Sequence, residues 1–124
     1  MLLREVKEVL DAEIIVGSDR LDLEVKEGGC ADLMADVLFL GKQGMLLLTG
    51  LTNPNIIHTA YTLGIAAIVL VRGKRPPQET VRLAEELQVP LLVTEYILFE
   101  TVGRLYAKGL IGCMQKVGGE QDLP

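Results

Sequence analysis

Three short apolar runs in the centre of the chain decide the fold: MLLLTG (Met45–Gly50), AAIVLV (Ala66–Val71) and LLVT (Leu91–Thr94). Each run is too short for a buried helix and lies close to Gly or Pro, so each predicts a strand buried on both faces. Amphipathic patterns typical of helices separate the runs, over residues 54–63 and from about Pro77 to Leu87. This alternation predicts a three-layer α/β fold, a mostly parallel sheet with helices on both faces.

Local signals set the ends of the helices. Asn53 is a good N-cap followed by Pro54 at the first helical position, and Gly64 ends that helix. Amphipathic patterns predict one further helix at the start of the chain, from Leu2 to Leu10, and another from Ile97 to about Lys108. Every strand of the central region is therefore expected to be followed by a helix.

The segment before the first apolar run carries weaker signals. Ala12–Gly17 predicts a short strand, and the alternating apolar residues of Leu21–Val25 predict an edge strand. The Gly28-Gly29 pair is expected to break that pattern, and Asp32 to cap a helix that ends at Leu40. The residues expected to be buried on this helix are Leu33, Met34, Val37 and Leu38.

The length and composition indicate one globular domain. The chain has 124 residues, of which 49% are hydrophobic and 23% are charged, and these values exclude a disordered, collagen-like or coiled-coil chain. We expect a single domain over residues 1–112 and a flexible C-terminal tail over residues 113–124, because the chain ends in a polar stretch that contains Gly.

Charge and hydropathy argue against nucleic acid and membranes as partners. Lys and Arg number 12 against 17 Asp and Glu, so the net charge is -5, which opposes nonspecific binding to polyanions. The longest apolar run, Leu63–Val71, is far shorter than the roughly 20 residues of a membrane-spanning helix. No export signal is evident and Cys30 and Cys113 form no C-x-x-C pair, so we expect a reduced, cytoplasmic protein.

Few side chains are suited to catalysis or metal binding. With one His (His58) and one Ser (Ser18), the chain does not offer a His-rich zinc site. Gly73-Lys74 is followed by Arg75, where a phosphate-binding P-loop needs Ser or Thr, and no G-x-G-x-x-G follows a predicted strand. We therefore expect no catalytic residue, no metal and no cofactor.

A ligand site is expected where the three central strands end. In an open parallel sheet, ligands bind beyond the carboxyl ends of the strands, near the N-termini of the following helices. The loops at these ends carry hydroxyl groups, an amide and cations, a combination that favours a small anion. The expected ligand-binding residues are Thr49, Gly50, Thr52, Asn53, Arg72, Gly73, Lys74, Arg75, Thr94 and Tyr96.

These features also have simpler structural interpretations. A cationic loop before a helix is commonly solvated surface, and Tyr96 is expected to pack against its neighbours more readily than to stack on a ligand ring. His58 is expected at the surface or in an interface. Ser18 fits a turn together with Asp19 and Arg20.

Longer stretches of the sequence resemble the DRTGG domain family. The resemblance runs from about Val6 to Tyr106 and is carried mainly by LAEELQVPLLVT (Leu83–Thr94) and TEYILFETVGRLY (Thr94–Tyr106). It implies a parallel α/β module that is found alone or beside CBS domains and is related to the N-terminal domain of HPr kinase/phosphorylase, without that enzyme's P-loop domain. Gly50 and Gly73 match the family's strand-end glycines, whereas the residues around them differ from its Asp-Arg and Thr-Gly-Gly.

Strand pattern, charge and resemblance together predict a regulatory protein without enzymatic activity. We expect it to sense an anionic small metabolite or nucleotide at the strand-end loops. A homodimer is also expected, because the mean hydropathy of +0.34 indicates more apolar surface than small monomers usually leave exposed. Two other interpretations stay open: a protein-interaction or dimerisation adaptor without a ligand, and a small transferase or hydrolase.

Overall fold

The three apolar runs form adjacent strands at the centre of the sheet in the computed structural model, which describes residues 1–117. They are β3 (Leu46–Thr49), β4 (Ala67–Leu70) and β5 (Leu91–Val93), and all of their residues are buried. Strand β3 pairs in parallel with β4, and β4 with β5. Unbroken apolar runs rather than alternating ones suit these strands, because helices cover both of their faces.

Two shorter strands complete the sheet at its edges. Strand β1 (Glu13–Val16) is antiparallel to β5, and β2 (Gly28–Cys30) is parallel to β3. The strand order is therefore β1-β5-β4-β3-β2, and the prediction of a mostly parallel α/β sheet is confirmed.

The Gly28-Gly29 pair, which was expected to break the preceding pattern, forms a strand that the sequence did not predict. Gly28 and Gly29 belong to β2 and pair with β3 through their backbones. A Cβ on Gly29 would lie 2.8 Å from both Met45 Cε and Cys113 Sγ. There is therefore no room for a side chain at position 29. Because this strand pairs through its backbone and is rich in Gly, it has no pattern of apolar side chains that would predict it.

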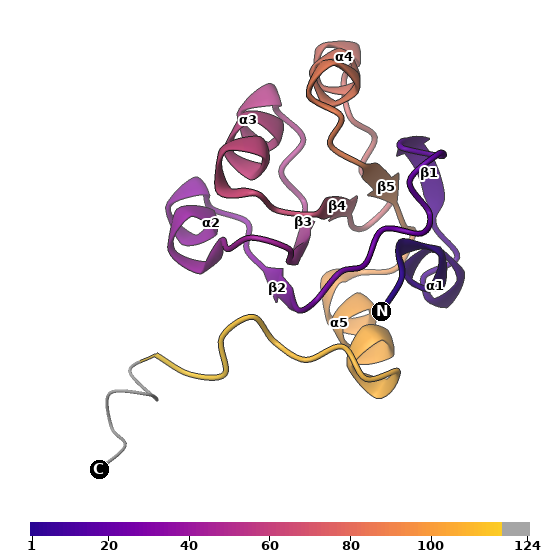
Figure 1. Cartoon of the computed structure of the whole chain (residues 1–124), viewed down its shortest axis with the longest axis vertical. Coiled ribbons are helices and arrows are strands. Elements are labelled where there is room, and N and C mark those ends of the chain that lie inside the picture. The colour runs from indigo at the N-terminus through magenta and orange to yellow at the C-terminus, as the bar shows by residue number, and fades with distance from the viewer. Residues whose placement is uncertain (118–124) are drawn as a thin grey trace.

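Helices cover the two faces of the sheet (Figure 1). One layer consists of α2 (Met34–Leu40), α3 (Pro54–Leu63) and α4 (Gln78–Leu87), and the other of α1 (Leu3–Val9) and α5 (Leu98–Ala107). Alternate strand residues serve two cores: Leu47 and Ile68 pack on the first layer, whereas Leu46 and Val69 pack on the second. The predicted helix ends agree closely, with Asn53 as the N-cap of α3 and Gly64 in the left-handed conformation after its last turn.

The edge strand predicted over Leu21–Val25 is wrong. The segment begins in a turn and forms only one isolated antiparallel bridge, between Glu24 and Leu2, although its alternation correctly places Val25 in the core. Its carbonyl oxygens accept hydrogen bonds from the start of α1 instead of from a neighbouring strand. The amides of Leu3 and Arg4 donate to the oxygens of Leu23 and Leu21 at 2.8 and 2.9 Å. The segment thereby satisfies first-turn amides of α1 that have no acceptor within the helix.

The prediction for α2 is correct in part. Its N-cap is Leu33 rather than Asp32. Val37 is buried and Met34 is partly buried as expected, but Leu33 and Leu38 are 66% and 59% exposed. This seven-residue helix lies over the glycine strand at the sheet edge, so only one stripe of its side chains reaches the core.

The residues that follow α5 return to the edge of the sheet. The amide of Gly28 donates to Ile111 O at 2.8 Å, and the amide of Cys113 donates to Gly28 O at 2.7 Å. The expected tail over residues 113–124 therefore begins with a residue that is hydrogen-bonded to β2, and its residues 118–124 lie outside the described part. Over residues 1–117, no helix has the length and apolarity needed to cross a membrane.

Candidate functional site

The carboxyl ends of the three central strands lie side by side at one rim of the sheet, which we call the C-terminal rim. Thr49 is level with Leu70, and Leu70 with Val93. Main-chain hydrogen bonds tie the following loops together: the amide of Arg72 donates to Tyr96 O at 2.9 Å, and the amide of Val71 donates to Thr49 O at 3.0 Å. The structure thus brings the loops with the predicted site residues together.

A fourth loop, which the sequence analysis did not include, joins the rim from β2. Asp32 follows this strand, and its Oδ1 accepts a hydrogen bond of 2.8 Å from the amide of Gly50. The same oxygen lies 3.5 Å from Thr49 Oγ1. Asp32 was expected to cap a helix, and its place at the rim follows once Gly28–Cys30 is recognised as a strand.

Gly50 leaves room for two side chains of opposite charge to approach each other. A Cβ at this position would lie 3.2 Å from Arg72 Nη2 and 3.5 Å from Asp32 Oδ1. Both side chains therefore reach over Gly50 from the strands on either side of β3. Even so, Arg72 forms no ion pair with Asp32 or with any other group in residues 1–117.

Arg72 also has an unusual backbone. Its φ is 60°, and that of Gly73 is 64°, so two consecutive residues are left-handed. Gly adopts this region freely, whereas a residue with a Cβ is disfavoured there by about 1 kcal/mol or more. The hydrogen bonds from the amides of Arg72 and Gly73 to the loop after β5 hold this turn in place.

The three predicted cations have different surroundings. Arg75 Nη1 lies 2.8 Å from Glu13 Oε1 of β1, and this exposed pair lowers the pKa of Glu13 chiefly through the hydrogen bond from Arg75. Lys74 is exposed and makes no ion pair within the described part of the chain. Arg72 and Lys74 are thus the cations available to an anion at the rim, whereas Arg75 is engaged at β1.

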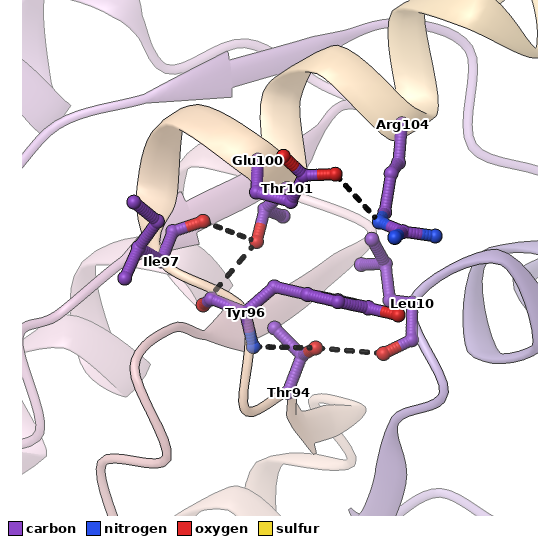
Figure 2. Close-up of polar contacts among 7 residues, drawn as sticks. All are labelled: Leu10, Thr94, Tyr96, Ile97, Glu100, Thr101 and Arg104. Carbon is purple, nitrogen blue, oxygen red and sulfur yellow. Dashed lines mark hydrogen bonds and ion pairs between the residues drawn. The ribbon is translucent and has the colours of Figure 1, made fainter.

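Two of the predicted hydroxyl groups stabilise the rim itself. Thr94 is buried, and its Oγ1 donates to Leu10 O at 2.7 Å while it lies 3.4 Å from the amide of Tyr96 (Figure 2). Thr49 is also buried, and its Oγ1 accepts from the amide of Leu51 at 3.1 Å. These hydroxyls connect loops and elements, so they position the rim rather than present free groups to a ligand.

Tyr96 is engaged by α5. The guanidinium of Arg104 lies 4.0 Å from the centre of the Tyr96 ring, a cation–π contact. Arg104 Nε also donates to Glu100 Oε2 at 3.0 Å (Figure 2). One face of the Tyr96 ring is therefore covered from within the chain, in agreement with the expectation that it packs against its neighbours.

The remaining predicted residues lie at the start of α3. Asn53 is exposed and its side chain makes no capping hydrogen bond, so its amide group is free to meet a ligand. Thr52 is partly buried, and its carbonyl accepts from Thr80 Oγ1 of α4 at 2.6 Å. Helices α3 and α4 both begin near the rim, where the positive ends of their dipoles favour an anion.

Two cavities lie away from the C-terminal rim. One, of about 340 Å³, is mainly apolar and lies between β2, α5 and the residues that follow α5. The other, of about 390 Å³, lies at the opposite rim and includes Gly44, Gly64 and Pro90, which precede β3, β4 and β5. None of the predicted site residues lines either of these two cavities.

Within residues 1–117, His58, Ser18 and the two cysteines lie on different elements of the fold. His58 is exposed on α3, and Ser18 lies in a turn beside the amino-terminal end of β5. Partial burial raises the pKa of both the Cys30 and the Cys113 thiols, which opposes thiolate formation. In residues 1–117, no cluster of three or more His, Cys, Asp or Glu side chains is placed to hold a metal ion.

Comparisons with known proteins agree with this architecture. The family model described as DRTGG domain matches residues 5–107. Among solved structures, the chain is similar to the CBS and DRTGG domains of the regulatory region of a Clostridium perfringens pyrophosphatase complexed with its activator, diadenosine tetraphosphate, with 17% identity and a TM-score of 0.70. The match covers 84% of this chain and 45% of that one. No curated protein sequence matches the chain.

Proposed function

The chain belongs to the DRTGG domain family, and from this premise we propose that it is a regulatory module without enzymatic activity that senses an anionic small metabolite or nucleotide. We place the ligand at the C-terminal rim, with Arg72 and Lys74 as the cations that meet it. Thr52 and Asn53 lie beside them at the start of α3 and offer polar groups to the same ligand. We also propose that the module works as a homodimer in the cytoplasm.

The conformation of Arg72 is the observation that carries this proposal. A left-handed non-glycine residue is retained at a cost in stability, and such strain is concentrated at binding sites. Its guanidinium lies over Gly50 without an ion-pair partner in residues 1–117. Strain at the backbone and an unpaired cation at the end of a central strand together favour a bound anion over a merely solvated loop.

The structural neighbour supports a nucleotide as one class of ligand. The pyrophosphatase region was solved with diadenosine tetraphosphate, a polyanion whose phosphates suit guanidinium and ammonium groups. A chain with a net charge of -5 would attract such a ligand only through a local arrangement of cations, which the rim offers.

A thermal-denaturation series with diadenosine tetraphosphate, ATP and acetyl phosphate tests this proposal. A ligand at ten times its Kd stabilises the folded state by about 1.4 kcal/mol, which raises the Tm by roughly 3 to 6 °C in a domain of this size. The Arg72→Ala/Lys74→Ala double variant should lose this shift. Arg82→Ala, which removes an exposed cation from α4, is the matched control and should keep it.

Two results would contradict the ligand site. A shift that persists in the double variant would place the ligand elsewhere on the molecule. The absence of a shift with every compound, together with a stable complex with another protein, would favour an adaptor without a ligand. Exposed apolar residues on α5, such as Phe99 at 85% exposure, give that second function its support.

A further inference from the structure

Helix α5 has two apolar faces, but residues 1–117 cover only one of them. Thr101 and Leu105 are buried on the inner face. A second set lies on the outer face at intervals of i, i+3, i+4 and i+7, the spacing by which one helix packs on another. This α5 stripe consists of Phe99, Val102, Gly103 and Tyr106, and its three large side chains are 85%, 37% and 67% exposed.

Gly103 is the least expected member of the α5 stripe. It lies inside the helix, where Gly lowers the stability of the fold relative to Ala. A Cβ at this position would meet no atom within 4 Å, so the fold of this chain does not require a Gly here. A second helix that crosses close to the backbone favours a small residue such as Gly here, because small residues let two helix backbones come near each other.

We propose that the α5 stripe is the surface through which two copies of this chain associate, with the two α5 helices antiparallel about a twofold axis near Val102 and Gly103. This proposal specifies the homodimer of the proposed function. In this arrangement Phe99 packs on Tyr106 of the partner subunit. Val102 fills the space above Gly103 of the partner subunit, and the same two contacts recur on the other side of the axis.

The pattern of the α5 stripe favours a second copy over an unrelated partner. In an antiparallel pair, Phe99 of one copy lies opposite Tyr106 of the other, and the β-branched Val102 lies opposite Gly103, which has no side chain. The stripe is therefore complementary to its own copy. An interface about a twofold axis requires this property, because one surface must fit its own copy. Aromatic residues are also typical of the side chains that contribute most to binding in protein interfaces.

Charge beside the α5 stripe is complementary in the same orientation. Glu100 and Arg104 flank the stripe on one side and form an ion pair within the helix. When a second α5 runs antiparallel, Glu100 comes close to Arg104 of the partner subunit, and the reverse pair forms as well.

The α5 stripe continues into the apolar cavity beside it. Val102 and Tyr106 line that cavity of about 340 Å³ together with Ile111 and Met114, which are 50% and 40% exposed. Figure 1 shows α5 at the lower edge of the fold, with no labelled helix below it. A second copy on the stripe would therefore cover a continuous apolar surface that extends from α5 to the edge of the sheet.

The mass of the full chain in solution, measured by light scattering and by sedimentation equilibrium, tests this interface. We expect a dimer for the natural chain and at least a 100-fold weaker dimer Kd for Gly103→Gln. Gln is a better helix former than Gly, so this variant should melt at a temperature no lower than the natural chain does as a monomer. Phe99→Glu should weaken the dimer to a similar extent, and Arg82→Gln on α4 should leave it intact.

The outcomes separate the interface from the rest of the proposed function. A monomer for the natural chain at several hundred micromolar would overturn both the homodimer and this surface. A dimer that is unchanged in both α5 variants would overturn the surface while it leaves the homodimer standing. The ligand proposal is tested independently, because its variants at Arg72 and Lys74 lie at the C-terminal rim and outside the α5 stripe.

Discussion

Helices α4 and α5 have the same length, ten residues each, but their outer faces differ. Both pack on the sheet through a buried Thr and a buried apolar residue, which are Thr80 and Ala84 in α4 and Thr101 and Leu105 in α5. The outer face of α4 carries charged side chains, including Glu79, Arg82, Glu85 and Glu86. The outer face of α5 carries the aromatic and aliphatic side chains of the α5 stripe.

The difference shows that two helices with the same pattern of buried residues can have outer faces suited to different surroundings, water for α4 and a binding partner for α5. The outer face of α4 is suited to contact with water, because its charges are solvated and the exposed large apolar residues include none from this helix. The α5 stripe leaves aromatic area exposed that residues 1–117 do not cover, and such area on a small domain indicates a binding surface. The two helices therefore serve as each other's control in the experiments that follow.

The largest expected effect separates the two faces of α5. Leu105 is 2% exposed, so Leu105→Ala removes buried methyl groups and should lower the free energy of unfolding by about 2 to 5 kcal/mol. Phe99→Ala should change it by less than about 0.5 kcal/mol. Both are measured by urea denaturation in the monomeric Gly103→Gln background, so that dimerisation does not contribute. Equal losses would mean that Phe99 packs within its own chain.

A smaller effect compares the end of α4 with the C-terminal rim. Gln88 at the end of α4 and Arg72 at the rim are both left-handed, with φ of 57° and 60°. Gln88→Gly and Arg72→Gly should each relieve backbone strain and raise the free energy of unfolding by about 1 kcal/mol. Only Arg72→Gly should abolish the thermal shift caused by the nucleotide.

The same pair of variants can contradict the functional interpretation of Arg72. If Arg72→Gly responds to diadenosine tetraphosphate as strongly as Gln88→Gly does, the conformation of Arg72 is a feature of the turn alone. If Arg72→Gly is less stable than the natural chain, its side chain contributes to folding, and strain retained for ligand binding is excluded.

The central strands were predictable because burial on both faces leaves a signal in side chains. Leu46–Thr49, Ala67–Leu70 and Leu91–Val93 are apolar almost throughout, and the Gly, Asn and Pro residues around them mark the turns. Strand Gly28–Cys30 left no such signal, because its pairing with β3 uses backbone groups that every residue has. The alternation of Leu21–Val25 correctly indicated which residues of this segment face the core. The carbonyl oxygens of the segment, however, accept from amides of α1 rather than from a strand.

The candidate site was predictable in position but not in detail. Once strands end at a common rim, their loops must meet there, so Gly50, Gly73 and Thr94 came together as expected. The pairing of Arg75 with Glu13 depends on β1 lying beside β5, and the order of strands is not written in local sequence patterns. Asp32 was missed for the same reason, because its place at the rim depends on the unrecognised strand before it.

The smallest expected effect uses the reactivity of Cys30 to compare the outer faces of α5 and α4. Cys30 lines the apolar cavity beside α5, and burial is the main cause that raises its pKa, followed by the negative charge of Asp32. A raised pKa lowers the thiolate fraction at neutral pH, so alkylation by iodoacetamide should be slower than that of a free thiol and should accelerate as the pH rises through the elevated pKa.

Dimerisation through the α5 stripe should slow this alkylation further, because the second copy covers the mouth of the cavity. At a pH held constant, we expect the rate for Cys30 to be about threefold lower in the natural dimer than in Gly103→Gln, as followed by mass spectrometry. A difference of this size corresponds to about 0.7 kcal/mol, within the range of partial protection. A cysteine introduced on the outer face of α4 by Arg82→Cys should react equally fast in both backgrounds, and protection of that thiol instead would move the interface from α5 to α4.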